Sequence, residues 1–118
     1  MMRPSKDVAV YLYTERVDFR KAIAGLSLIV EQVMDKNVFE ESLFVFSNRQ
    51  HNRIKILYWE RNGFCLWYKV LEQERFKWPK TSDTETMTLS GEELNWLLDG
   101  FNIWNNQPHK KLLYSSVS

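Results

Sequence analysis

Two runs of strand-forming residues flank a short polar turn, and this pattern constrains the fold more than any other part of the sequence. The runs cover residues 53–59 and 64–71, and both are rich in β-branched and aromatic side chains. The residues between them end in Asn62-Gly63, a pair typical of hairpin turns. The pattern predicts a β-hairpin near the middle of the chain.

The register of this hairpin decides which side chains share a face, because a shift of one residue moves every side chain to the other face. A two-residue turn at Asn62-Gly63 would pair Lys55 with Val70 and leave both faces mixed. A three-residue loop at 61–63 gives one wholly apolar face, and we expect this register. Its apolar pairs are Ile54 with Val70, Ile56 with Tyr68 and Tyr58 with Leu66, and its other face pairs Lys55 with Lys69, Leu57 with Trp67 and Trp59 with Cys65.

Shorter apolar patterns predict further strands. Residues 8–13 alternate as a half-buried strand does, and the run 43–46 is typical of a buried strand. Residues 76–78 precede Pro79, which cannot continue a central ladder, so we expect a short edge strand there. A polar linker is expected over residues 80–88.

Two helices are expected. Apolar residues recur at helical spacing from Phe19 to Met34, behind Asp18 as a suitable N-cap. Ser90 and Glu93 match a capping box for a second helix that ends near Gly100. The predicted fold class is therefore α+β, a mainly antiparallel twisted sheet with one long helix packed on one face and a second, C-terminal helix.

The chain has 118 residues, the usual size of one domain. We expect a single α+β domain over residues 1–101 and a polar, loose tail over 102–118. The longest apolar run, residues 64–68, is far short of the roughly 20 residues of a membrane span, and the N-terminus is unlike a signal peptide. Cys65 is the only cysteine, so no intramolecular disulfide can form. We expect a cytoplasmic protein with no membrane contact.

Charge is distributed unevenly along the chain. The formal net charge is only +1, yet residues 49–80 contain eight lysines and arginines against three glutamates. A basic middle between acidic ends indicates either an anionic partner or a solvated polar surface.

Arg20 and Lys21 fall in the first turn of the first predicted helix, where the helix dipole disfavours cations. Either a nearby acid such as Asp18 or Glu15 neutralises them, or they bind an anion such as phosphate together with the helix N-terminus. The sequence leaves both interpretations open.

The sequence offers little for catalysis. His51 and His109 have no spacing that makes them a pair, and no nucleophile elbow, P-loop or dinucleotide fingerprint is present. Cys65 stands among apolar residues, where a thiol is inert. We expect no catalytic residue, no metal site and no cofactor.

The non-core face of the hairpin combines cations with flat rings. Lysines and arginines attract phosphates, and indoles stack on unpaired bases, so the face suits nucleic acid. A helix or a second subunit over the same face would explain it equally well, because protein interfaces also favour Trp, Tyr and Arg.

Four blocks of the sequence carry a family resemblance. They are Asp18-Phe19-Arg20-Lys21 with Gly25-Leu26; residues 43–46 through 53–59 with Gly63; Lys69-Val70-Leu71-Glu72 followed by Phe76-Lys77-Trp78-Pro79; and Leu89-Ser90 with Leu94 and residues 97–100. In this order and spacing the blocks resemble the TnpB-type accessory protein, the second open reading frame, of the insertion-sequence-66 family of bacterial transposable elements. Departures from the family occur at Glu60, where an aspartate is common, and at Gln73-Glu74, which replace a more basic or Gly-containing stretch.

The resemblance implies a small non-catalytic protein that assists a separate transposase. The expected partners are the transposase of the same element and the DNA of the element ends, and a homo-oligomer is a further expectation. A protein–protein adaptor without direct DNA binding is the alternative. The nucleic-acid-binding candidates are Arg20, Lys21, Arg49, Arg53, Lys55, Trp59, Trp67, Lys69, Lys77 and Trp78.

Overall fold

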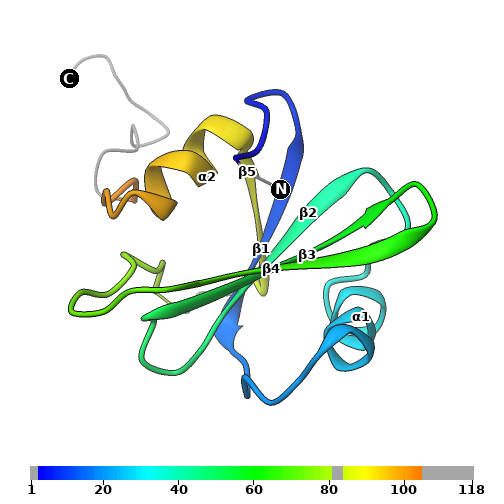
Figure 1. Ribbon diagram of the computed structural model, residues 1–118, viewed down its shortest axis with the longest axis horizontal. Coiled ribbons are helices and arrows are strands. Elements are labelled where there is room, and N and C mark those ends of the chain that lie inside the picture. Colours follow the sequence, from blue (N-terminus) through cyan, green and yellow to red (C-terminus); the bar gives the residue numbers. More distant parts are fainter. Residues whose placement is uncertain (1–2, 81–83, 105–118) are drawn as a thin grey trace.

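The structure is a computed structural model that describes residues 3–80 and 84–104. Five strands form one sheet in the order β4-β3-β2-β1-β5, with two helices outside it (Figure 1). The elements in chain order are β1 (Ala9–Arg16), α1 (Ile23–Gln32), β2 (Ser42–Ser47), β3 (Arg53–Glu60), β4 (Gly63–Val70), β5 (Thr86–Ser90) and α2 (Gly91–Leu98).

The sheet is mixed, with one parallel pair among antiparallel ones. β1 and β2 run parallel, and the chain connects them through α1, whereas the pairs β1–β5, β2–β3 and β3–β4 are antiparallel. Parallel strands need such a crossover, because a tight turn can only reverse the chain. The parallel arrangement places the C-terminal ends of both strands together, with Arg16 opposite Ser47. The α+β prediction is confirmed in this mostly antiparallel form.

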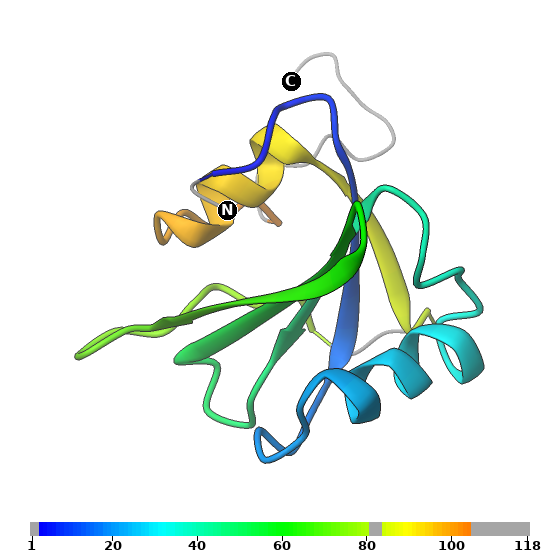
Figure 2. The same cartoon turned by 45° about the vertical axis from the view of Figure 1, so that its right-hand side comes forward.

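The helices cover opposite faces of the sheet, α2 above and α1 below in the view of Figure 2. Leu26 and Val30 of α1 join a core cluster with Phe44 on one face. The other face carries a second cluster, in which Leu94 and Leu97 of α2 are members. Because both faces are covered, every residue of the central strand β2 is buried, as its continuous apolar run predicts.

The first helix is shorter than predicted, because it begins at Ile23 rather than after Asp18. The carboxylate of Asp18 instead accepts the backbone N–H of Arg20 at 3.0 Å and holds a turn that precedes the helix. Phe19 and Met34 pack into the α1-side cluster from outside the helix. Both residues are spaced as on a helix because they pack into the same core cluster, although they do not belong to one continuous helix.

The second helix begins with the predicted capping box. The Ser90 hydroxyl accepts the backbone N–H of Glu93 at 3.1 Å, and the Glu93 carboxylate accepts the backbone N–H of Ser90 at 2.9 Å. Gly91 follows at a point where the N-terminal segment crosses the helix, and a Cβ there would lie 1.8 Å from the carbonyl oxygen of Ser5. Gly100 ends the element with a φ of 95°.

The predicted edge strand at 76–78 and linker at 80–88 are both corrected. Residues 71–80 form no strand, and β5 at Thr86–Ser90 supplies the edge beside β1. Phe76 is buried in the α2-side cluster, and its backbone N–H donates to the carbonyl of His51 at 2.7 Å. The apolar pattern at 76–78 thus reflects docking of a loop.

The hairpin has neither of the registers considered from the sequence, and the expected three-residue loop is wrong. Glu60 pairs with Gly63 across a two-residue loop, so Gly63 begins β4 and Arg61 takes the positive φ of 58° that such loops require. Lys55 lies opposite Tyr68, and Lys69 lies opposite Ile54. The two lysines therefore point to opposite faces of the sheet. A register that keeps one face purely apolar has no advantage here, because both faces are covered.

Of the predicted tail, the structure describes the residues up to Trp104. Ile103 is buried in the α2-side cluster, and the Trp104 indole N–H donates to the backbone carbonyl of Lys77. The rest of the tail lies outside the described residues. Within the described ranges, neither helix is long and apolar enough to span a bilayer.

Candidate nucleic-acid interface

Lys55, which was expected on an exposed face, is buried with 6% of its surface exposed. Its ammonium donates to the backbone carbonyls of Phe19 at 2.8 Å and Lys21 at 2.9 Å. It also lies over the rings of Phe19 and Tyr68, and its burial lowers the pKa of the side chain. This lysine fastens the β1–α1 loop to the sheet and is not free to bind phosphate.

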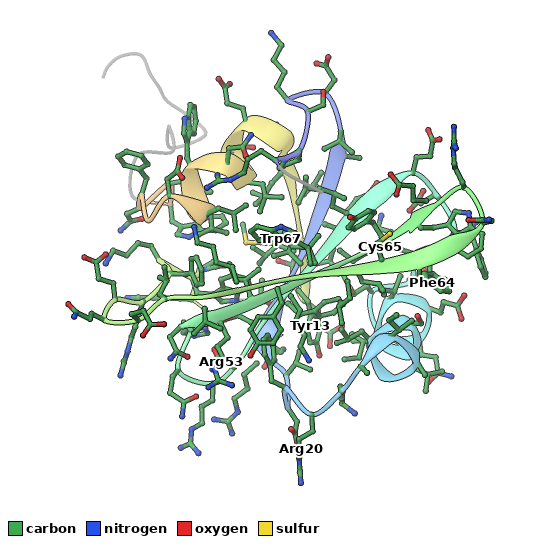
Figure 3. All side chains as sticks on the ribbon, in the orientation of Figure 1. Tyr13, Arg20, Arg53, Phe64, Cys65 and Trp67 are labelled. Carbon is green, nitrogen blue, oxygen red and sulfur yellow. The ribbon has the colours of Figure 1, made fainter. Side chains whose placement is uncertain are left out.

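The other hairpin candidates also make internal contacts. The Lys69 ammonium donates to the carbonyl of Leu98 at 2.9 Å, at the C-terminal end of α2, where a cation is favourable. Trp67 packs against the α2-side cluster, and Trp59 makes edge-to-face contacts with Phe64 and Phe39. In Figure 3, Trp67 lies on the α2 side of the hairpin and Phe64 on the side of α1. The expected basic-aromatic sheet face therefore does not form, because Lys55 and Lys69 lie on opposite faces of the sheet.

The remaining cationic candidates are exposed. Arg20 forms an ion pair with Asp18 at 2.6 Å, which holds the pKa of that carboxyl well below its usual range. This contact matches the structural interpretation of Arg20, in which a nearby acid neutralises it. Arg53 donates to the Tyr68 hydroxyl at 3.2 Å, and Figure 3 places Arg20 and Arg53 at the same lower end of the molecule. The aliphatic part of the Lys21 side chain lies beside Gly25, and both Lys21 and Lys77 are exposed.

A pocket of about 520 Å³ opens at the end of the sheet where β1 and β2 finish. Three cationic side chains on its wall come from different parts of the chain, and Trp78 and His51 supply flat rings. We call the pocket together with the neighbouring Arg75 the basic end. Its lining residues are Thr14, Glu15, Arg16, Arg49, His51, Trp78, Pro79 and Lys80.

The parallel pairing of β1 and β2 explains how this end forms. Arg16 closes β1, and the β2–β3 loop that carries Arg49 starts from the neighbouring strand end. Asn48 fixes this loop, because its side-chain carbonyl accepts the backbone N–H groups of Asn52 and Arg53, each at 3.1 Å. These hydrogen bonds stabilise the loop conformation that places Arg49 at this end of the sheet.

The two rings of the basic end are also fixed. The His51 imidazole stacks on the Trp78 indole with centroids 5.7 Å apart and planes 14° apart. The Trp78 indole N–H donates to the carbonyl of Thr14 at 3.2 Å, and His51 Nδ1 lies 3.1 Å from the Ser47 hydroxyl. Burial, and then the charge of Arg75, lower the pKa of His51, which favours the neutral ring.

The basic end carries uncompensated positive charge. Among the described residues, no ion pair joins Arg16, Arg49 or Lys80 to a carboxylate. Glu15 is the one acidic side chain that lines the pocket. Cations without partners are exposed to solvent at little cost and are available to an anionic ligand.

Comparison with known proteins identifies the family. The family described as IS66 Orf2-like protein matches residues 8–108, a range that contains all five strands and both helices. The chain belongs to the IS66 Orf2-like family. This membership confirms the resemblance described from the sequence blocks. The family consists of accessory proteins associated with IS66 transposable elements and is not a known catalytic family.

Two relatives from Sinorhizobium fredii are similar over most of their length. The uncharacterized protein y4hO is 31% identical over 100 residues, which cover 85% of this chain and 86% of the relative. The uncharacterized protein y4jC is 29% identical over 110 residues, which cover 93% and 92% of the two chains. No solved structure matches the chain.

Within this IS66 Orf2-like chain, the structure brings two of the predicted residues, Arg49 and Trp78, into one site. Sequence reasoning did not include Arg16, Lys80 or His51 among the candidates. The missing signal was the parallel pairing of residues 9–16 with 42–47, which joins segments far apart in the sequence. The described residues contain no cluster of three His, Cys, Asp or Glu side chains suited to a metal.

Proposed function

We propose that the protein is a non-catalytic accessory factor of IS66 transposition that binds the phosphate backbone of element DNA through its basic end. The observation that carries this proposal is the gathering of Arg16, Arg49 and Lys80 around one pocket without ion-pair partners among the described residues. The family association with a DNA element makes DNA the fitting polyanion. Transposase binding remains part of the proposal through other surfaces.

Binding of this kind is dominated by release of counterions from the DNA. With about four phosphate contacts, affinity should fall roughly 100-fold between 50 and 200 mM salt. Fluorescence anisotropy with a labelled duplex from the terminus of an IS66 element measures this dependence. Affinity that stays constant across this salt range, or no binding at 50 mM salt, would contradict the proposal.

A second candidate function is self-association through the edge strand β4. Edge strands are normally protected by charges, prolines or bulges, because their free backbone groups can pair with another chain. β4 pairs with β3 over eight residues without a bulge, contains no proline, and has Lys69 as its only charge. That ammonium is bound to the carbonyl of Leu98. The edge therefore lacks the usual protection among the described residues.

The occupant that we propose for this edge is a second copy of the chain. The backbone N–H of Leu71 donates to the carbonyl of Asn52, the residue before β3, so alternate residues such as Tyr68 and Val70 direct their N–H groups outward. An antiparallel pair of β4 strands centred on Trp67 would match these outward groups. It would also bring Arg61 of one copy near Glu72 and Glu74 of the other.

Light scattering tests this candidate. Tyr68→Pro removes one outward N–H and should convert a dimer into a monomer, whereas Tyr68→Ala removes the same side chain, keeps the N–H and should remain dimeric. A wild-type protein that is monomeric at high micromolar concentration would rule the edge out as a self-association site.

A further inference from the structure

We infer that the pocket of the basic end receives a single unpaired nucleotide, whose base stacks on the Trp78–His51 ring pair while its phosphates contact the surrounding cations. This inference rests on the proposed function and specifies the form of DNA that the site recognises. It follows from the combination of a concave site, two fixed rings and cations from three segments of the chain.

The shape of the site favours an unpaired nucleotide over a continuous duplex. Pockets for small ligands commonly measure about 300–1,000 Å³, and this one measures about 520 Å³. Bases inside a duplex present only their edges, because their faces are stacked on neighbouring bases. An aromatic side chain inside a pocket can therefore stack only on a base that has left the stack.

The rings are in place before a ligand binds. Trp78 is anchored to the carbonyl of Thr14 in β1, and His51 is positioned by the Ser47 hydroxyl at the end of β2. His51 also adopts a φ of 57°, in the left-handed region that few non-glycine residues occupy. A ring pair that is already ordered loses little conformational entropy when a base stacks on it.

The charged side chains that line the pocket are distributed as the phosphates and the base of a nucleotide require. The planar guanidinium groups of Arg16 and Arg49 can each form bidentate hydrogen bonds with a phosphate, and the Lys80 ammonium adds a further positive charge. Glu15 would repel a phosphate, but a carboxylate can accept hydrogen bonds from the amino group of a base. We therefore expect the phosphates near the cations and the base edge near Glu15.

A second pocket lined by described residues does not fit this ligand. It lies at the opposite end of the sheet, near the start of β2 and the hairpin loop, and has a volume of about 570 Å³. Glu41 and Glu60 line it beside a single cation, Arg61, so its charge opposes phosphate binding. The contrast between the two ends singles out the basic end for an anionic ligand.

The inference is tested with two labelled duplexes of the same element-end sequence, one fully paired and one with a single unpaired nucleotide. The wild-type protein should bind the second duplex about 10-fold more tightly, because stacking adds to the phosphate contacts. Using the ratio of the two affinities removes the effect of any inactive protein, since both are measured on one sample.

Tryptophan substitutions show which ring is responsible for the preference for the unpaired nucleotide. Trp78→Leu should lower this ratio to about 1, and Trp78→Phe, which keeps a ring, should restore most of it. Trp59→Leu removes an aromatic side chain at the other end of the hairpin and should leave the ratio unchanged. A wild-type ratio near 1 with firm duplex binding would overturn the inference and spare the proposed function. Absence of binding to both duplexes would overturn both.

Discussion

At the scale of single residues, Lys55 has the most instructive position. A buried ammonium is costly unless its donors are satisfied, and here two backbone carbonyls and two aromatic rings take the place of a carboxylate. A lysine opposite another lysine suggests an exposed anion site when only the sequence is known. The observed register separates the pair and gives this lysine a structural role.

Substitution of Lys55 by methionine should therefore destabilise the fold. The variant keeps the apolar stem but leaves the carbonyls of Phe19 and Lys21 without their donor, a loss of about 1–3 kcal/mol in the free energy of unfolding. Urea denaturation measures it, with the exposed Lys6→Met as the control, for which the change should stay within about 0.5 kcal/mol. Equal stabilities of the two variants would show that the bonds of Lys55 contribute nothing.

His51 makes stability depend on pH. Its folded-state pKa lies below the ordinary value of 6.5, because burial and Arg75 disfavour the charged ring. The unfolded chain then binds more protons than the folded protein as the pH falls below about 6.5, so acid destabilises the fold. The slope can reach about 1.4 kcal/mol per pH unit from one group.

His51→Asn isolates this effect, since asparagine tolerates the positive φ of this position but does not titrate. We expect the wild type to lose more unfolding free energy than the variant between pH 7 and pH 5, measured by denaturation at each pH. Parallel pH profiles for the two proteins would contradict the stated shift of the His51 pKa.

At the scale of elements, the sequence predicted those whose signals are local. The capping box of α2 depends on Ser90 and Glu93 alone, and the strands at 42–47 and 53–60 carry strong β propensity, so these elements were found. The predictions were wrong where tertiary contacts determine the strand register or the presence of a strand. The hairpin register depends on a sheet that is covered on both faces, and β5 is recognisable only through its pairing with β1.

The crossing of the N-terminal segment over α2 gives an element-scale prediction. Gly91→Ala should cost about 1–3 kcal/mol in unfolding free energy, because the new Cβ would meet the backbone oxygen of Ser5 and force the two elements apart. Gly63→Ala is the matched control, since a Cβ there would meet nothing within 4 Å. Thermal unfolding compares them. A Gly91→Ala protein as stable as Gly63→Ala would show that this crossing is not tightly packed.

At the scale of the whole molecule, the sheet offers its ends and edges to partners, because helices cover its two faces. The basic run at 49–80 is divided accordingly, with Lys55 and Lys69 used inside and Arg49 and Lys80 exposed at the basic end. The sequence predicted that cations and rings would meet in the folded protein. It identified Arg49 and Trp78 but not Arg16, which reaches the site only through the parallel pairing of β1 with β2.

The most direct test of the account compares two double charge reversals that change net charge equally. Arg16→Glu with Arg49→Glu alters the basic end, and Lys6→Glu with Arg61→Glu alters the opposite end of the sheet. Fluorescence anisotropy with element-end DNA at fixed salt measures the affinity of both. We predict a loss of at least about 10-fold for the basic-end variant beyond that of the other. Equal losses, or a greater loss for the opposite end, would contradict the assignment of DNA binding to the basic end.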